Sequence, residues 1–168
     1  MPFSKVFVMP QGMDSASVCL CLKDKAPLQC GVCQQALCKK CACFTTEDSF
    51  ALDLKISPEF KHGAYCPDCF HQTVSPAEIE YEERLALARA VSVYLKGQGK
   101  ETRLMKRKHP PLLVEDCQDR EEALMKLAFA AVQLGYRILI DVDLVSTKVR
   151  HGGYQTLIWR GSAVPFKD

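Results

Sequence analysis

The sequence predicts an α+β protein: a small cysteine-rich unit, then a helix, then a small domain of β-α-β-β order. Three observations lead to this expectation. Nine of the ten cysteines lie between Cys19 and Cys69. Acidic residues follow Ser75 in the pattern of a helix N-terminus. The last third of the chain combines a helical pattern with two strand-like segments.

The composition indicates a globular protein without strong overall charge. The chain has 168 residues, which suits one ordinary domain or two small ones. Its net charge of +2 gives no long-range attraction to nucleic acid or membrane. No apolar run approaches the ~20 residues that span a bilayer, and the segment MPFSKVFVMPQGMD lacks the apolar core of a signal peptide. We therefore expect a cytoplasmic location, where clustered cysteines indicate metal rather than disulfides.

Four cysteine pairs at short spacing predict two metal sites. They are Cys19-Leu-Cys21, Cys30-Gly-Val-Cys33, Cys38-Lys-Lys-Cys41 and Cys66-Pro-Asp-Cys69. Two thiolates separated by two residues can hold one tetrahedral ion across a tight turn, and two such pairs complete a site. Eight ligands therefore suffice for two ions. Four thiolates suit iron as well as zinc, but zinc is the commoner structural ion, and a closed zinc site has no open position for catalysis.

The order of the pairs predicts which of them share an ion. The Cys66–Cys69 pair stands just before a helix start, as the last ligand pair of a treble-clef finger does. The Cys30–Cys33 pair would be the knuckle of that site. The second ion would then fall to the Cys38–Cys41 pair with the Cys19–Cys21 pair, so that the two sets interleave as in a cross-brace. Other soft ligands stay open as replacements for Cys19 or Cys21: Cys43, His62 and His71.

The segments CGVCQQALCKKC and YCPDCF resemble the latter two thirds of a FYVE-type zinc finger, over residues 19–72. The resemblance implies that Cys30–Cys33 and Cys66–Cys69 share one ion and that Phe70 fills the family's aromatic position. The Cys19–Cys21 pair has one intervening residue where the family has two. The family's basic stretch, which reads phosphoinositide, is replaced by Ala26-Pro27-Leu28-Gln29. Binding to membrane lipid is therefore an alternative rather than the leading interpretation.

Residues 75–111 are expected to form a helix and a basic linker. Ser75-Pro76-Ala77-Glu78 has the form of a capping box, with Pro76 at the first helical position. The helix is predicted to continue through Leu95 and to stop at Gly97. The linker holds six cations against Glu101: Lys96, Lys100, Arg103, Lys106, Arg107 and Lys108. These cations could contact phosphates, but no aromatic residue is interleaved, so a solvated connector is the favoured interpretation.

Residues 112–168 are expected to form the small α/β domain. A short strand at 112–114 precedes a helix, which Asp116 or Asp119 can cap and Gly135 can end. The segment 136–144 alternates like a half-buried strand, and 154–159 returns as its hairpin partner. The helix carries two apolar stripes, and a helix on a sheet needs only one. The second stripe, Met125, Phe129 and Val132, must meet the helix after Ser75 or another subunit.

This C-terminal segment is similar to the second half of the YbjQ-type, so-called heavy-metal-binding family, over residues 112–165. The similarity rests on EEAL at 121–124, LGY at 134–136, IDV at 140–142 and GSAV at 161–164. Members of that family tend to assemble through this unit, which implies a homo-oligomer. The segment's soft ligands are few: His109, Cys117 and His151. We expect Cys117 to be buried and inert.

The sequence as a whole favours a non-enzymatic interaction or adaptor protein with two structural zinc ions. Its expected parts are a finger at 1–74, a helix and linker at 75–111, and a small domain at 112–168. A protein partner is expected, with self-association through the last domain, whereas nucleic acid is not. Two alternatives remain: a peripheral membrane or phosphoinositide-binding protein, and a thiol-dependent redox or metal-handling protein.

Overall fold

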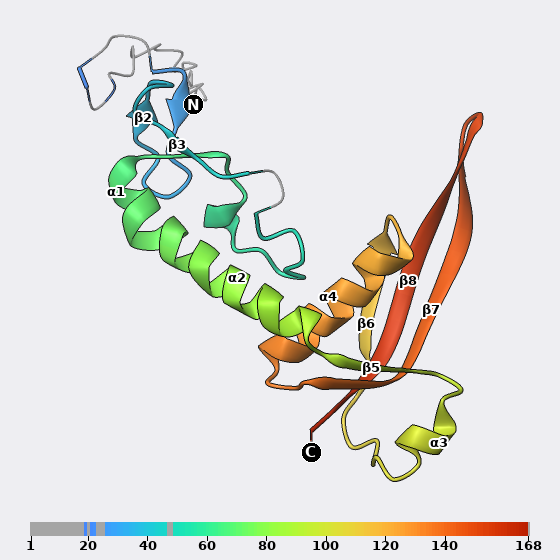
Figure 1. Ribbon diagram of the computed structural model, residues 1–168. Helices are drawn as coiled ribbons and strands as arrows, with labels where there is room; N and C mark the ends of the chain where they lie inside the picture. The colour runs from blue at the N-terminus through green and yellow to red at the C-terminus, as the bar shows by residue number, and fades with distance from the viewer. Residues whose placement is uncertain (1–18, 20, 23–25, 47–48, 168) are drawn as a thin grey trace, which may run out of the picture.

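The computed structural model describes residues 19, 21–22, 26–46 and 49–167, and it confirms the mixed α+β class. Figure 1 shows three parts in chain order: a small unit of short strands and turns, one long helical rod, and a four-stranded sheet that carries a helix. The rod connects the cysteine-rich end of the molecule to the sheet.

The N-terminal unit, residues 19–65, is built on two antiparallel strand pairs. β1 (Leu28–Gln29) pairs with β2 (Ala36–Leu37), and β3 (Cys43–Phe44) pairs with β4 (Ala64–Tyr65). A short 3-10 helix, η1 (Pro58–Phe60), precedes β4. Strands this short cannot hold a large apolar core, because each contributes at most one inward side chain. The unit is therefore mostly turns, and those turns bring the cysteines together.

The helical rod begins earlier than predicted, so the expected capping box at Ser75 is wrong. Helix α1 (Pro67–Cys69) leads without a break into a π-helical turn, η2 (Phe70–Val74), and then into α2 (Ser75–Arg89). The side chain of Ser75 makes no capping hydrogen bond there. Pro76 lacks an N–H and its ring would press on the carbonyl four residues earlier. The wider π turn, in which Ser75 N–H donates to the carbonyl of Phe70, makes room for that ring.

The rod also ends earlier than predicted. Helix α2 stops at Arg89, and the segment expected to continue it forms strand β5 (Ser92–Leu95), which pairs in parallel with β7. Val93 and Tyr94 favour a strand, and their backbone finds partners on the edge of β7 that a helix would not use. Residues 75–111 are thus not a separate linker, because β5 belongs to the C-terminal sheet.

The C-terminal sheet has four strands in the order β5-β7-β8-β6. The prediction of a β-α-β-β domain did not include β5. Strand β6 (Leu112–Cys117) is followed by helix α4 (Arg120–Gln133) and by a long hairpin of β7 (Ile138–His151) and β8 (Tyr154–Phe166). The hairpin turns at Gly152, whose φ of +61° suits glycine. Its strands run well past their predicted ends, and their far halves extend beyond the other two strands (Figure 1).

Helix α4 packs with one stripe on the sheet and with the other against α2. Asp119 caps the helix by accepting a hydrogen bond from the backbone N–H of Glu122 at 2.7 Å, and Gly135 ends it with a φ of +80°. Phe129, on the second stripe, is fully buried, and its ring lies 5.1 Å from that of Tyr81 on α2. The second stripe therefore meets α2 within the chain at Phe129, while Met125 stays half-buried.

One apolar core crosses the boundary that the sequence placed at residue 74. Phe50 of the N-terminal unit stacks on Phe60 and meets the edge of the Tyr81 ring. Phe50 and Tyr81 belong to the same buried cluster as Phe129 and Leu139 of the C-terminal domain, and Phe60 packs against it. The two ends of the molecule therefore share one apolar core, and the N-terminal unit is not an independent domain on a linker.

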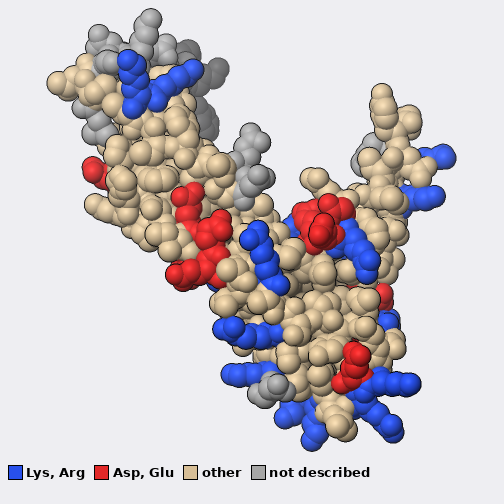
Figure 2. All heavy atoms as spheres, viewed as in Figure 1, with Lys and Arg blue, Asp and Glu red and all other residues tan. Residues whose placement is uncertain are grey.

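The basic segment after β5 is held against the sheet at both ends. It contains a short helix, α3 (Gly99–Thr102), and lies at the lower end of the molecule, where Figure 2 shows many Lys and Arg side chains. Lys96 pairs with Asp143 at 2.8 Å, and Arg107 forms a bidentate pair with Asp141. Among the described residues, every helix is too short or too polar to cross a lipid bilayer.

Candidate metal centres

Two groups of four cysteine thiols come together in the N-terminal unit and at the start of the rod. In each group the four sulfur atoms lie within 4.8 Å of one another. The first cluster is Cys19, Cys21, Cys38 and Cys41, and the second cluster is Cys30, Cys33, Cys66 and Cys69. The eight residues are those that the sequence singled out, in the pairing it favoured.

The first cluster is organised by the turn that follows β2. The backbone N–H of Cys41 donates to the carbonyl of Cys38 at 3.0 Å, which closes the Cys-Lys-Lys-Cys turn. The backbone N–H of Cys38 in turn donates to the sulfur of Cys19 at 3.0 Å. The sulfur atoms of Cys21 and Cys38 are 3.7 Å apart. Backbone N–H groups aimed at sulfur stabilise the thiolate form that a metal requires.

The second cluster joins the turn after β1 to the first turn of the rod. Cys66 is the N-cap of α1, and its sulfur accepts a hydrogen bond from the backbone N–H of Cys69 at 3.4 Å. Its sulfur lies 3.8 Å from that of Cys33. The backbone N–H of Gly31 donates to the carbonyl of Ala64, which ties the two turns together. A Cβ on Gly31 would lie 2.5 Å from the Cβ of His62, so only glycine fits there.

The sulfur spacings match those of a tetrahedral ion. A Zn–S bond of about 2.3 Å places the corners of a tetrahedron about 3.8 Å apart. The measured spacings of 3.7 Å and 3.8 Å agree with that edge. Four thiolates would saturate a four-coordinate ion, and an ion held by all four would have no position left for a substrate or an activated water.

The thiols of each cluster differ in acidity because they share a small volume. Burial opposes ionisation of Cys38 and of Cys30, but hydrogen bonds from backbone N–H groups outweigh it and lower each pKa to about 6. Contacts with the other thiols of its cluster raise the pKa of Cys41 to about 12, and the pKa of Cys69 is raised in the same way. Each cluster thus contains a readily ionised thiol, Cys38 or Cys30, beside one whose proton is held more firmly, Cys41 or Cys69, and an ion that binds all four must displace that proton.

The residues left open as alternative ligands do not join either cluster. Cys43 lies on β3, and neither it nor His62 or His71 belongs to a group with metal-ligand spacing among the described residues. Instead, the side chain of His62 lies over Gly31. Cys117 is fully buried in the C-terminal core, and burial raises the pKa of its thiol, so it is unreactive.

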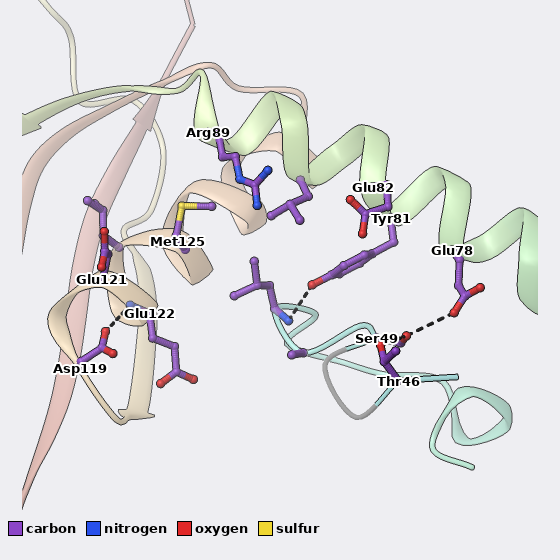
Figure 3. A pocket seen from close by; sticks show the side chains of 14 residues that line it. Thr46, Ser49, Glu78, Tyr81, Glu82, Arg89, Asp119, Glu121, Glu122 and Met125 are labelled. Atoms are coloured by element: carbon purple, nitrogen blue, oxygen red, sulfur yellow. Dashed lines mark hydrogen bonds between the residues drawn. The ribbon is translucent and has the colours of Figure 1, made fainter. Parts of the chain in front are cut away.

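Sequence reasoning missed a cleft of about 930 Å³ between the N-terminal unit, α2 and the start of α4. Figure 3 shows its acidic side chains, with Glu78 and Glu82 on one wall and Asp119, Glu121 and Glu122 on the other. The sequence does show acidic residues near the starts of two helices, but the helix dipole alone is enough to explain acidic residues at such positions. Only the packing of α2 on α4 makes these residues face one hollow. We name this hollow the acidic cleft.

Comparison of the chain with protein-family models, curated proteins and solved structures finds no match. The fold and the clusters therefore define a class: a mixed α+β protein with two four-cysteine groups that could hold metal ions.

Proposed function

We propose that this chain is a non-enzymatic interaction protein, an adaptor, whose N-terminal unit is stabilised by two structural zinc ions. The observation that carries the proposal is the pair of closed four-thiol clusters with tetrahedral sulfur spacing. Catalysis at a metal needs an open coordination position, and four protein ligands per ion leave none. Binding to a partner is the function that fits a metal used only for folding.

The N-terminal unit needs such support because its own core is small. Around the first cluster, the buried apolar residues in the described part of the chain are Cys19, Ala26 and Cys38, so two of these three are ligands. Units of this size lack enough apolar area to fold without a metal or disulfides. In such units the free energy of metal binding is largely folding free energy. We therefore expect metal binding at the two clusters to supply much of the folding free energy of this unit.

The interleaved ligand sets support the interpretation as a cross-brace finger. The second cluster combines a cysteine pair after β1 with a pair at the start of a helix, and this order supports the proposal of a treble clef. The resemblance to FYVE-type fingers is consistent with this arrangement. Phosphoinositide binding is not part of the proposal, since Ala26-Pro27-Leu28-Gln29 supplies no cation. For the last domain we retain the resemblance to the YbjQ-type family, although its helix α4 is already covered by α2.

Native mass spectrometry of the intact protein, combined with elemental analysis, tests the proposal. The expected result is two zinc ions per chain, with all eight cluster cysteines resistant to alkylation until a chelator removes the ions. Removal of the ions should also unfold residues 26–46, seen as rapid hydrogen exchange there. A protein purified without metal, with those cysteines linked as disulfides, would overturn the proposal. A single thiol that reacts at neutral pH in the zinc-loaded protein would favour the redox alternative instead.

A further inference from the structure

The acidic cleft has an apolar floor. Leu52 from the N-terminal unit, Leu85 from α2, and Leu124 and Met125 from α4 line it, and all four are half-buried. Each of them also packs against the central core, so the floor is held in place from behind. Methionine adapts to different apolar partners because its chain is unbranched and its sulfur is polarisable. The floor can therefore receive apolar side chains from outside the molecule.

The rim of the cleft is strongly negative. Among the described residues that line the cleft, five carboxylates stand against one cation, Arg89. One of the five is neutralised: Glu122 pairs with Lys126 at 2.7 Å, which lowers the pKa of that carboxyl. Among the described residues, the other four form no ion pair. They are Glu78, Glu82, Asp119 and Glu121. A ligand that complements this rim carries positive charge on both sides of an apolar stripe.

The walls of the cleft are fixed before any ligand arrives. Ser49 donates to Glu78 at 3.2 Å, and the backbone N–H of Leu52 donates to the hydroxyl of Tyr81 at 3.3 Å (Figure 3). These bonds hold the loop of the N-terminal unit against α2. The opposite wall is α4, which packs on the same helix. A pre-formed hollow loses less conformational freedom on binding than a loop that must close.

We propose that the acidic cleft binds a basic amphipathic helix of a partner protein. Two helices converge on the cleft, and a third helix laid between them would place its apolar stripe on the floor and its Lys or Arg side chains along both rims. The inference deepens the proposed adaptor function by assigning the surface and the chemistry of the partner. It also explains why the N-terminal unit is packed on α2, since this unit supplies part of the floor.

The test uses the zinc-loaded full chain and a synthetic probe. The probe is a fluorescent peptide of about four helical turns with Leu at helical spacing and Lys at the other positions. Two companion peptides carry the same residues in a scrambled order, or Glu in place of every Lys. Binding is measured by fluorescence anisotropy. We expect micromolar affinity for the amphipathic Lys peptide, at least tenfold weaker binding of the scrambled peptide, and no binding of the Glu peptide.

Charge-reversal variants locate the binding surface. The double variant Glu82→Lys and Glu121→Lys should weaken binding about tenfold, because it turns two attractions into repulsions. The matched control is Glu83→Lys with Glu115→Lys, which reverses two exposed carboxylates that do not line the cleft. The control should change the affinity less than twofold. Thermal melts of all variants verify that each is folded.

Several outcomes would overturn the proposal. They are equal binding to both double variants, equal binding of the scrambled peptide, or no binding at millimolar protein. A dimer in sedimentation velocity that Glu82→Lys and Glu121→Lys dissociate would assign the cleft to a second copy instead. Elemental analysis of the same sample separates the two proposals. If the protein carries zinc but does not bind the peptide, only the proposal of peptide binding at the acidic cleft is refuted. If the protein binds the peptide but carries no metal, only the proposal of two zinc sites is refuted.

Discussion

Replacing Phe129 tests whether the two ends of the molecule share one core. Phe129 is fully buried, its ring lies 5.1 Å from that of Tyr81, and the guanidinium of Arg84 lies 5.4 Å from its centre. Truncation of a buried Phe to Ala costs about 3–5 kcal/mol. The aromatic pair adds about 0.5–1.5 kcal/mol beyond burial. Phe129→Ala should therefore remove about 5 kcal/mol, a large part of the 5–15 kcal/mol typical of a domain. Phe129→Leu keeps most of the volume and should lose about 1–2 kcal/mol.

The measurement follows both ends of the molecule during denaturation. Trp159 is the single tryptophan, it packs against the shared core from β8, and its fluorescence reports the C-terminal sheet. Hydrogen exchange of residues 49–60 reports the N-terminal side. For Phe129→Ala both should be destabilised together. Leu134→Ala, at an exposed site that ends α4, should change stability by less than about 0.5 kcal/mol. If Phe129→Ala lowers the stability of the sheet but leaves the hydrogen exchange of residues 49–60 unchanged, the two ends of the molecule do not unfold as one cooperative core.

Three further perturbations address the clusters and the basic segment. Gly31→Ala should lower the affinity of the second cluster for its ion by up to about 100-fold, measured in competition with a chelator, because the new Cβ overlaps His62. The second substitution His62→Gly in the same chain should restore this affinity. Cys69→Ser should lower the metal content by one ion per chain, whereas Cys43→Ser should leave it unchanged; native mass spectrometry counts the ions. Asp141→Asn removes the partner of Arg107, which holds the pKa of that carboxyl below its usual range. The stabilisation from this depressed pKa is present above about pH 4 and fades as the pH falls through the pKa, so urea melts of variant and parent should differ at pH 7 and converge near pH 2.

The cysteine pairing could be predicted because ligand geometry is local. Two residues between Cys38 and Cys41 or between Cys66 and Cys69 set a turn of fixed size whatever surrounds it. The choice of partners followed from the position of Cys66–Cys69 before a helix, and the structure brings the same residues together. The α4 helix was equally accessible, since Asp119 and Gly135 mark its ends in the sequence.

The predictions of local structure were wrong where contacts between residues far apart in the sequence determine the conformation. Ser92 to Leu95 has the apolar residues of a helix end, but β7 offers its backbone a parallel partner that no local pattern reveals. Ser75-Pro76 reads as a helix start, although a helix that begins at Pro67 can pass through it by means of a π turn. The acidic cleft depends on the packing angle of two helices, and nothing in the order of residues encodes that angle directly.

The far half of the β7–β8 hairpin has a consequence for the behaviour of the protein at high concentration. Beyond Val142 on one strand and Trp159 on the other, neither β5 nor β6 pairs with the ribbon, so among the described residues both of its outer edges lack a partner strand. Such free edges invite intermolecular strand pairing. The ribbon bears the exposed cations Lys148 and Arg150, and like charges on a second ribbon would be forced together by that pairing. We therefore expect these two cations to oppose fibril-like assembly of the ribbon.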